Sequence, residues 1–139
     1  MEILLKSASL ILLATLLGSP ILILLKLKKV TQKNIFIKYL ILATLISSVL
    51  AIVFGWWSDQ SNNILLSHYG YNFDAMNDIE RYKNVQLLNM EKVKKIEISI
   101  MGIGWPLKVI MSYIYYFPYL LILYVITYFY DYFKNIKSS

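Results

Sequence analysis

The sequence predicts an all-α integral membrane protein with three transmembrane helices, and two observations support this fold class. The chain is 58% hydrophobic and carries charge at only 16% of its 139 positions, which gives a mean hydropathy of +0.57. Its apolar residues also form three long uncharged runs, whereas a soluble core spaces them at helical or strand periods. Each run approaches the ~20 residues that a helix needs to cross a hydrocarbon core of about 30 Å.

The first predicted span covers about residues 3–25. The nineteen residues between Lys6 and Lys26 carry no charge. A cleavable signal peptide also has a short apolar stretch, and Gly-Ser-Pro at 18–20 would suit its end. The apolar run resumes after this tripeptide and continues through Leu25. We therefore expect the segment to be retained as a membrane helix.

The second predicted span covers about residues 35–57. Twenty uncharged residues separate Lys38 from Asp59, and the run ends in Trp56 and Trp57. Tryptophan is enriched where a bilayer meets water. This end of the span is therefore expected to lie at the headgroup layer.

The third predicted span covers about residues 106–130, because twenty-two uncharged residues separate Lys108 from Asp131. Pro118 lies inside it and predicts a kink, since proline lacks the N–H that bonds the carbonyl four residues earlier. The span is rich in tyrosine and has almost no small residues. Its aromatic side chains are expected to face lipid and neighbouring helices loosely.

The lysines predict the orientation, because short loops rich in Lys and Arg remain in the cytoplasm. The connector at 26–34 and the start of the second span hold five lysines and no acid, at positions 26, 28, 29, 33 and 38. The tail at 131–139 adds two more, whereas the loop at 58–105 mixes acids and bases. We expect an N-out, C-in protein with the loop outside. Thirteen lysines against one arginine suggest a bacterial or phage source and the bacterial inner (plasma) membrane.

Small residues predict where the helices pack. In the second span they recur at every fourth position and form a stripe where another backbone can approach closely. The stripe consists of Ala43, Ser47, Ala51 and Gly55, and the first span offers Ala14 and Gly18 at the same spacing. Packing of the first two spans as an antiparallel hairpin is one interpretation. Docking of a partner helix or of a second copy of the chain is the other.

The loop at 58–105 predicts a surface for contacts with another membrane or envelope protein. Asn72 is expected to cap a helix that begins near Asp74, and Asp78 and Arg81 are expected to pair along it. Residues 85–101 fit an interfacial helix, with a strand through "KIEISIM" as the alternative. Aromatic side chains near charges are typical of protein interfaces. The candidate docking residues are Tyr71, Phe73, Asp74, Asp78, Glu80, Arg81 and Tyr82. A solvated cap over the spans is the alternative interpretation.

The sequence contains no constellation typical of an enzyme. It has no cysteine and one histidine, His68, so transition-metal and nucleophile sites lack their usual partners. Asp74, Asp78 and Glu80 lack the alternating ligand spacing of a calcium loop. The three uncharged runs, at 7–25, 39–58 and 109–130, hold no Asp, Glu, Lys, Arg or His, the ionisable residues that ion-coupled carriers usually place within their spans. We therefore expect no cofactor and no metal. We also expect no nucleic-acid partner, because the basic residues flank apolar runs, where they set the orientation in the membrane.

Three functions remain open. The first is a non-enzymatic subunit or modulator of a larger envelope membrane complex. The second is a pore-former, since three spans, an N-out and C-in orientation and a basic tail are similar to one class of holins, which have a short turn where this chain has a long loop. The third is an immunity or superinfection-exclusion protein that binds an incoming toxin or phage component. In all three the lipid bilayer is the first partner.

Overall fold

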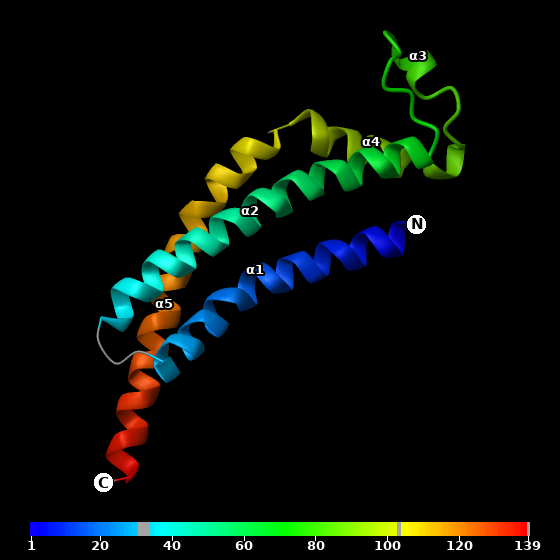
Figure 1. Cartoon of the computed structure of the whole chain (residues 1–139). Helices are drawn as coiled ribbons and strands as arrows, with labels where there is room; N and C mark the ends of the chain where they lie inside the picture. The colour runs from blue at the N-terminus through cyan, green and yellow to red at the C-terminus, as the bar shows by residue number, and fades with distance from the viewer. Residues whose placement is uncertain (31–33, 103, 139) are drawn as a thin grey trace.

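The computed structural model describes residues 1–30, 34–102 and 104–138 and confirms three long apolar helices (Figure 1). These are α1 (Glu2–Val30), α2 (Ile35–His68) and α5 (Trp105–Ser138). Between α2 and α5 lie α3 (Asp78–Arg81), the 3-10 helix η1 (Leu87–Asn89) and α4 (Met90–Met101). Lys33, one of the connector lysines, lies outside the described residues.

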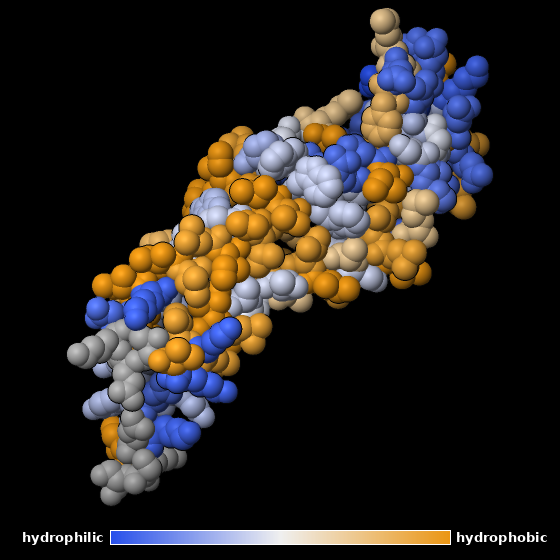
Figure 2. Space-filling model, viewed as in Figure 1, coloured by the Kyte–Doolittle hydropathy of each residue, from blue (hydrophilic) through white to orange (hydrophobic). Residues whose placement is uncertain are grey.

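The three long helices run together between two polar ends. Helices α1 and α2 form an antiparallel hairpin, and α5 packs along α2 (Figure 1). We call the end where α1 meets α2 the connector end, and the end that carries α3 and α4 the loop end. Figure 2 shows a hydrophobic surface over the middle of the molecule and hydrophilic side chains gathered at the two ends. This pattern is that of a protein whose middle lies in a bilayer.

Helix α2 extends well beyond the predicted span. It contains 34 residues, which at 1.5 Å per residue gives about 51 Å, against about 30 Å of hydrocarbon. The final part, residues 58–68, therefore projects past the Trp56–Trp57 pair. Helix α4 packs on this projection. The loop thus folds on a continuation of the second span and does not begin at its end.

Two ion pairs fasten α5 to the other helices, one at each boundary of the apolar region. At the loop end the ammonium of Lys108 lies 3.2 Å from the carboxylate of Asp59 on α2. At the connector end Lys28 of α1 pairs with Asp131 and also donates to the carbonyl of Thr127, at 3.3 Å. Lys108 and Asp131 are about 35 Å apart along a straight helix. The spacing of the ion pairs therefore matches the thickness of a bilayer.

The small-residue stripe of α2 is buried within the chain. Ala43, Ser47, Ala51 and Gly55 are all buried. At Gly55 the approach of α5 is so close that a Cβ would lie 2.5 Å from Cγ2 of Val109. At the opposite end of the stripe the fully buried Tyr39 donates its hydroxyl to the carbonyl of Leu120, at 3.2 Å.

Ala14 and Gly18 occupy a different surface from the one expected of them. Ala14 is exposed, and a Cβ built on Gly18 would meet no described atom within 4 Å. The buried face of α1 instead carries Leu16, Pro20 and Leu24. The physical reason is that the large side chains Leu16 and Leu24 of α1 share one core with the small residues of α2, so α1 does not need small residues on that face.

Pro20 leaves a backbone carbonyl of α1 without its helical N–H donor, and side-chain hydroxyl groups donate to it instead. Proline has no N–H, so the carbonyl of Leu16 lacks its normal partner. The hydroxyl of Ser19 donates to this carbonyl at 3.2 Å from within α1, and the hydroxyl of Tyr116 on α5 donates to it at 2.6 Å. The hydroxyl of Tyr119 donates to the carbonyl of Leu17 at 2.7 Å. An unsatisfied carbonyl in hydrocarbon is costly. The expectation that the aromatic residues of the third span face their neighbours loosely was therefore wrong for these two tyrosines. Pro118 lies within α5, which continues helical through it.

Replacing Tyr116 with phenylalanine is expected to destabilise the helix bundle by about 0.6–1.7 kcal/mol, the range found for hydrogen bonds between helices of a folded membrane protein. Unfolding in mild-detergent micelles titrated with a denaturing detergent measures this change. In a Pro20→Ala background the alanine N–H can bond the Leu16 carbonyl, so the same substitution should have a much smaller effect. Equal effects in both backgrounds would contradict the assigned role of the hydroxyl.

Candidate functional site

Residues 69–101, which we call the cap, cover the projecting end of α2 (Figure 1). The chain reverses at Gly70, whose φ of +84° suits glycine. A Cβ at this position would lie 2.6 Å from the carbonyl oxygen of Asn84. The amide of Tyr71 then donates to the carbonyl of Leu66 at 3.0 Å, and the amide of Asn72 to that of Arg81 at 3.0 Å. The loop is thus a closed turn with its own hydrogen bonds.

The predicted helix after Asn72 was wrong in its start and its length. The helix α3 has only four residues, and Asn77 caps it by accepting from the amide of Glu80 at 2.8 Å. Asn72 instead accepts from the amide of Asp74, at 3.1 Å, in a local turn. Asparagine favours such turns as readily as helix caps. The predicted pairing of Asp78 with Arg81 is present at 3.4 Å.

Helix α4 places one carboxylate in the interior of the cap. Its segment "KIEISIM" is helical, so the strand alternative was wrong. The helix buries Val93 completely and also buries Glu97, one turn later on the same face. Val93 packs in a small apolar cluster with Leu66, Tyr71 and Val85. Glu97 therefore lies inside the cap, between α4 and the preceding loop residues 71–82.

Three loop side chains converge on Glu97. The hydroxyl of Tyr71 donates to one carboxylate oxygen at 2.5 Å, and the hydroxyl of Tyr82 donates to the other. The guanidinium of Arg81 lies 3.5 Å from the carboxylate and also donates to the carbonyl of Ala75, at 3.3 Å. A buried carboxylate is tolerated when its charge is paired and its oxygens accept hydrogen bonds. These contacts give the loop its fixed shape.

The same contacts shift the pKa values of the cluster. Burial opposes ionisation of Glu97, but the hydrogen bonds from Tyr71 and Tyr82 and the charge of Arg81 outweigh it, so its pKa lies below the ordinary value of 4.5. The bond to Glu97, with burial, raises the pKa of Tyr82 to about 12. Burial, followed by the bond to Glu97, raises the pKa of Tyr71. The cluster is thus built for an ionised acid and two neutral phenols.

We expect the cap to be most stable between the ordinary pKa values of the acid and the phenols. A lowered carboxyl pKa contributes stability above 4.5 that is lost as the pH falls through the folded value. A raised phenol pKa contributes stability below 10.0 that is lost as the pH rises through about 12. Amide-exchange protection factors of the loop between about pH 3 and about pH 6 test the acid limb, and near-ultraviolet circular dichroism tests the alkaline limb. Unchanged protection across the acid range would contradict the assignment.

The seven candidate docking residues divide into two groups. Tyr71 is buried, and Arg81 and Tyr82 are partly buried, so these three hold the cap together. Phe73, Asp74, Asp78 and Glu80 are exposed. The structure also brings forward four exposed apolar side chains that the sequence pattern did not single out, because they follow no helical or strand period. They are Met76, Ile79, Leu87 and Leu88, each at least 87% exposed.

The exposed face of the cap carries apolar side chains and carboxylates. Among the described residues no three of His, Cys, Asp or Glu gather where they could hold a metal ion. Comparison with models of protein families, with curated proteins and with solved structures finds no match to this chain.

Proposed function

We propose that the protein is a non-enzymatic subunit or modulator of a larger membrane complex and that its cap docks another envelope protein. The observation that carries the proposal is the set of nearly fully exposed apolar side chains Met76, Ile79, Leu87 and Leu88 on a loop with its own fixed shape. Large apolar residues presented in this way are typical of interaction sites. The neighbouring acids Asp74, Asp78 and Glu80 favour a partner with basic residues at the rim of the contact.

Affinity purification in mild detergent, followed by mass spectrometry, tests this function. A variant with Met76, Ile79, Leu87 and Leu88 changed to serine should lose the co-purifying partner. These side chains contribute little to the fold because they are exposed, so a thermal unfolding curve close to wild type is expected. The matched control changes the exposed polar residues Lys83, Asn84 and Gln86 to alanine and should retain the partner. Retention of every partner by the serine variant would refute the docking proposal.

The proposed function requires the cap to face away from the cytoplasm, as the lysine distribution predicts. The absence of native cysteine permits a direct test with single-cysteine variants. Met76→Cys lies in the cap and Lys29→Cys at the connector end, and both positions are exposed. A membrane-impermeant maleimide should label the first in intact cells and the second only after permeabilisation. The reverse labelling pattern would overturn the N-out, C-in orientation.

A further inference from the structure

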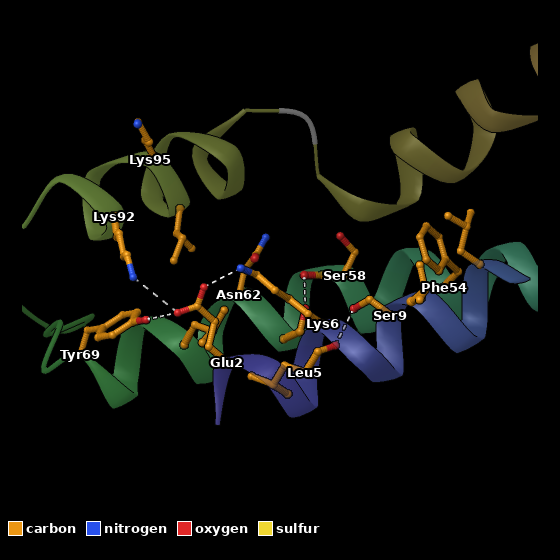
Figure 3. Close-up of a pocket in the computed structure, with 15 residues that line it drawn as sticks. Glu2, Leu5, Lys6, Ser9, Phe54, Ser58, Asn62, Tyr69, Lys92 and Lys95 are labelled. Atoms are coloured by element: carbon orange, nitrogen blue, oxygen red, sulfur yellow. Dashed lines mark hydrogen bonds and ion pairs between the residues drawn. The ribbon is translucent and has the colours of Figure 1, made fainter. Parts of the chain in front are cut away.

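A groove of about 670 Å³ lies toward the loop end, between residues 2–13 of α1, residues 54–65 of α2, and α4 (Figure 3). Its lower wall is apolar and includes Leu10, Leu13 and Phe54. The charged side chains that line the groove are Glu2 and Lys6 on α1 and, facing them, Lys92 and Lys95 on α4. The groove thus has two ends of different character. The charged end carries the lysines and Glu2, and the apolar end carries Leu10, Leu13 and Phe54.

The charged end is already ordered around a carboxylate. Glu2 lies 2.6 Å from the ammonium of Lys6 and 3.6 Å from that of Lys92, and it accepts a hydrogen bond from the hydroxyl of Tyr69 at 2.9 Å. Figure 3 shows Lys6 and Lys92 directed toward Glu2 from opposite helices, while Lys95 points away from it. Lys95 pairs with Glu91 along α4, at 2.9 Å, with both side chains largely exposed. The two lysines directed into the groove, Lys6 and Lys92, therefore share one carboxylate and leave an excess of positive charge.

The apolar end lies at the level where the hydrocarbon begins. Near it, the indole N–H of Trp57 donates to the hydroxyl of Ser9 at 3.1 Å, so these residues lie at one height. Tryptophan marks the boundary between hydrocarbon and headgroups. Below this level the groove shares Leu13 and Phe54 with a second cavity of about 410 Å³ between α1, α2 and α5. An apolar path thus continues from the charged end into the depth of the bilayer.

We propose that this groove binds one anionic phospholipid, with the phosphate near Lys6 and Lys92 and an acyl chain along Leu13 and Phe54. The charge complementarity selects an anionic headgroup, since lysines beside a membrane surface attract anionic lipid. The apolar lower wall selects an acyl chain over a soluble phosphate ester. The site is separate from the exposed face of the cap and does not rest on the docking function.

Native mass spectrometry of the full chain, purified and mixed with phosphatidylglycerol or with phosphatidylcholine of the same acyl chains, tests the proposal. Wild-type protein should retain one phosphatidylglycerol in preference to phosphatidylcholine. The double variant Lys6→Gln/Lys92→Gln should lose that retention at least about tenfold, given roughly 1 kcal/mol per lysine at a membrane surface. Glu2→Gln should strengthen retention, because it removes the competing carboxylate.

The matched control is Lys83→Gln/Lys94→Gln, which removes the same charge from exposed cap positions outside the groove. It should retain the lipid as wild type does. Leu13→Trp, which fills the groove at its narrow apolar end, should reduce retention with every lysine intact. Equal retention of the two lipids by wild type, or equal loss in the two double variants, would overturn the proposal.

Discussion

Replacing Gly55 with leucine is expected to separate α5 from α2 and to destabilise the bundle by about 3 kcal/mol or more, beyond the usual range for a single overpacked methylene. A Cβ alone would lie 2.5 Å from Cγ2 of Val109 and 3.5 Å from the carbonyl oxygen of Trp105. Valine cannot rotate freely away because its χ1 is restricted in a helix. Unfolding in mixed micelles measures the loss, and Gly55→Ala should show a smaller loss of about 1–3 kcal/mol.

Two further variants isolate the cause. Gly18→Ala makes the same chemical change in α1, where a Cβ would meet no described atom within 4 Å, and it should leave stability unchanged or slightly raised. Val109→Ala removes the clashing methyl, so Gly55→Ala should cost less in that background, with a coupling of about 1 kcal/mol. If Gly18→Ala and Gly55→Ala were equally destabilising, close approach at Gly55 would not be the reason.

The spans could be predicted because their signal is local. A run of about twenty uncharged residues between Lys38 and Asp59 has one physical meaning, whichever helices surround it. Their partners could not be predicted in the same way. The spacing of Ala43 to Gly55 indicates a surface for close packing, but it does not say which helix fills it, and α5 rather than the small residues of α1 approaches closest at Gly55.

The hydrogen bonding around Pro20 can be predicted from the sequence in part. Its missing N–H identifies the Leu16 carbonyl as open from the sequence alone. One donor, Ser19, lies three positions away, and the other, Tyr116, lies 100 positions away in the chain. The sequence thus defines the need for a donor and offers a local one, whereas the donor from α5 is assigned only by the tertiary fold.

The cap was the least predictable part, because its organisation depends on distant partners. Asn72 and Asn77 are equally suited by residue type to the N-cap position of a helix. The choice between them follows from closure of the loop, in which the amide of Asn72 donates to the carbonyl of Arg81. Tyr71 and Glu97 are 26 positions apart. The sequence placed Tyr71, Arg81 and Tyr82 among contact residues but assigned their contacts to a partner, whereas all three bind Glu97 in the same chain.

Replacing Glu97 with alanine is expected to open the cap without unfolding the three spans. The change leaves the hydroxyls of Tyr71 and Tyr82 without their acceptor and removes one of the two carboxylates that pair with Arg81, which keeps Asp78. Unsatisfied buried groups of this kind cost about 1–3 kcal/mol each, and partial access of water to Arg81 reduces the sum. We expect a loss of about 2–3 kcal/mol, which raises the open fraction of the loop about 30- to 150-fold. Hydrogen exchange of the loop amides measures this fraction.

The comparison variants separate charge from shape. Glu97→Gln keeps an acceptor and the volume of the side chain but removes the charge that faces Arg81, so its effect should be intermediate. Glu91→Ala removes an exposed acid from the same helix and should change exchange little, since its pair with Lys95 is solvated. Because the spans bury their own contacts, amides in α1 and in residues 39–55 should exchange as in wild type. Uniformly faster exchange would show instead that the cap and the spans unfold as one unit, and Glu97 would then stabilise the whole bundle.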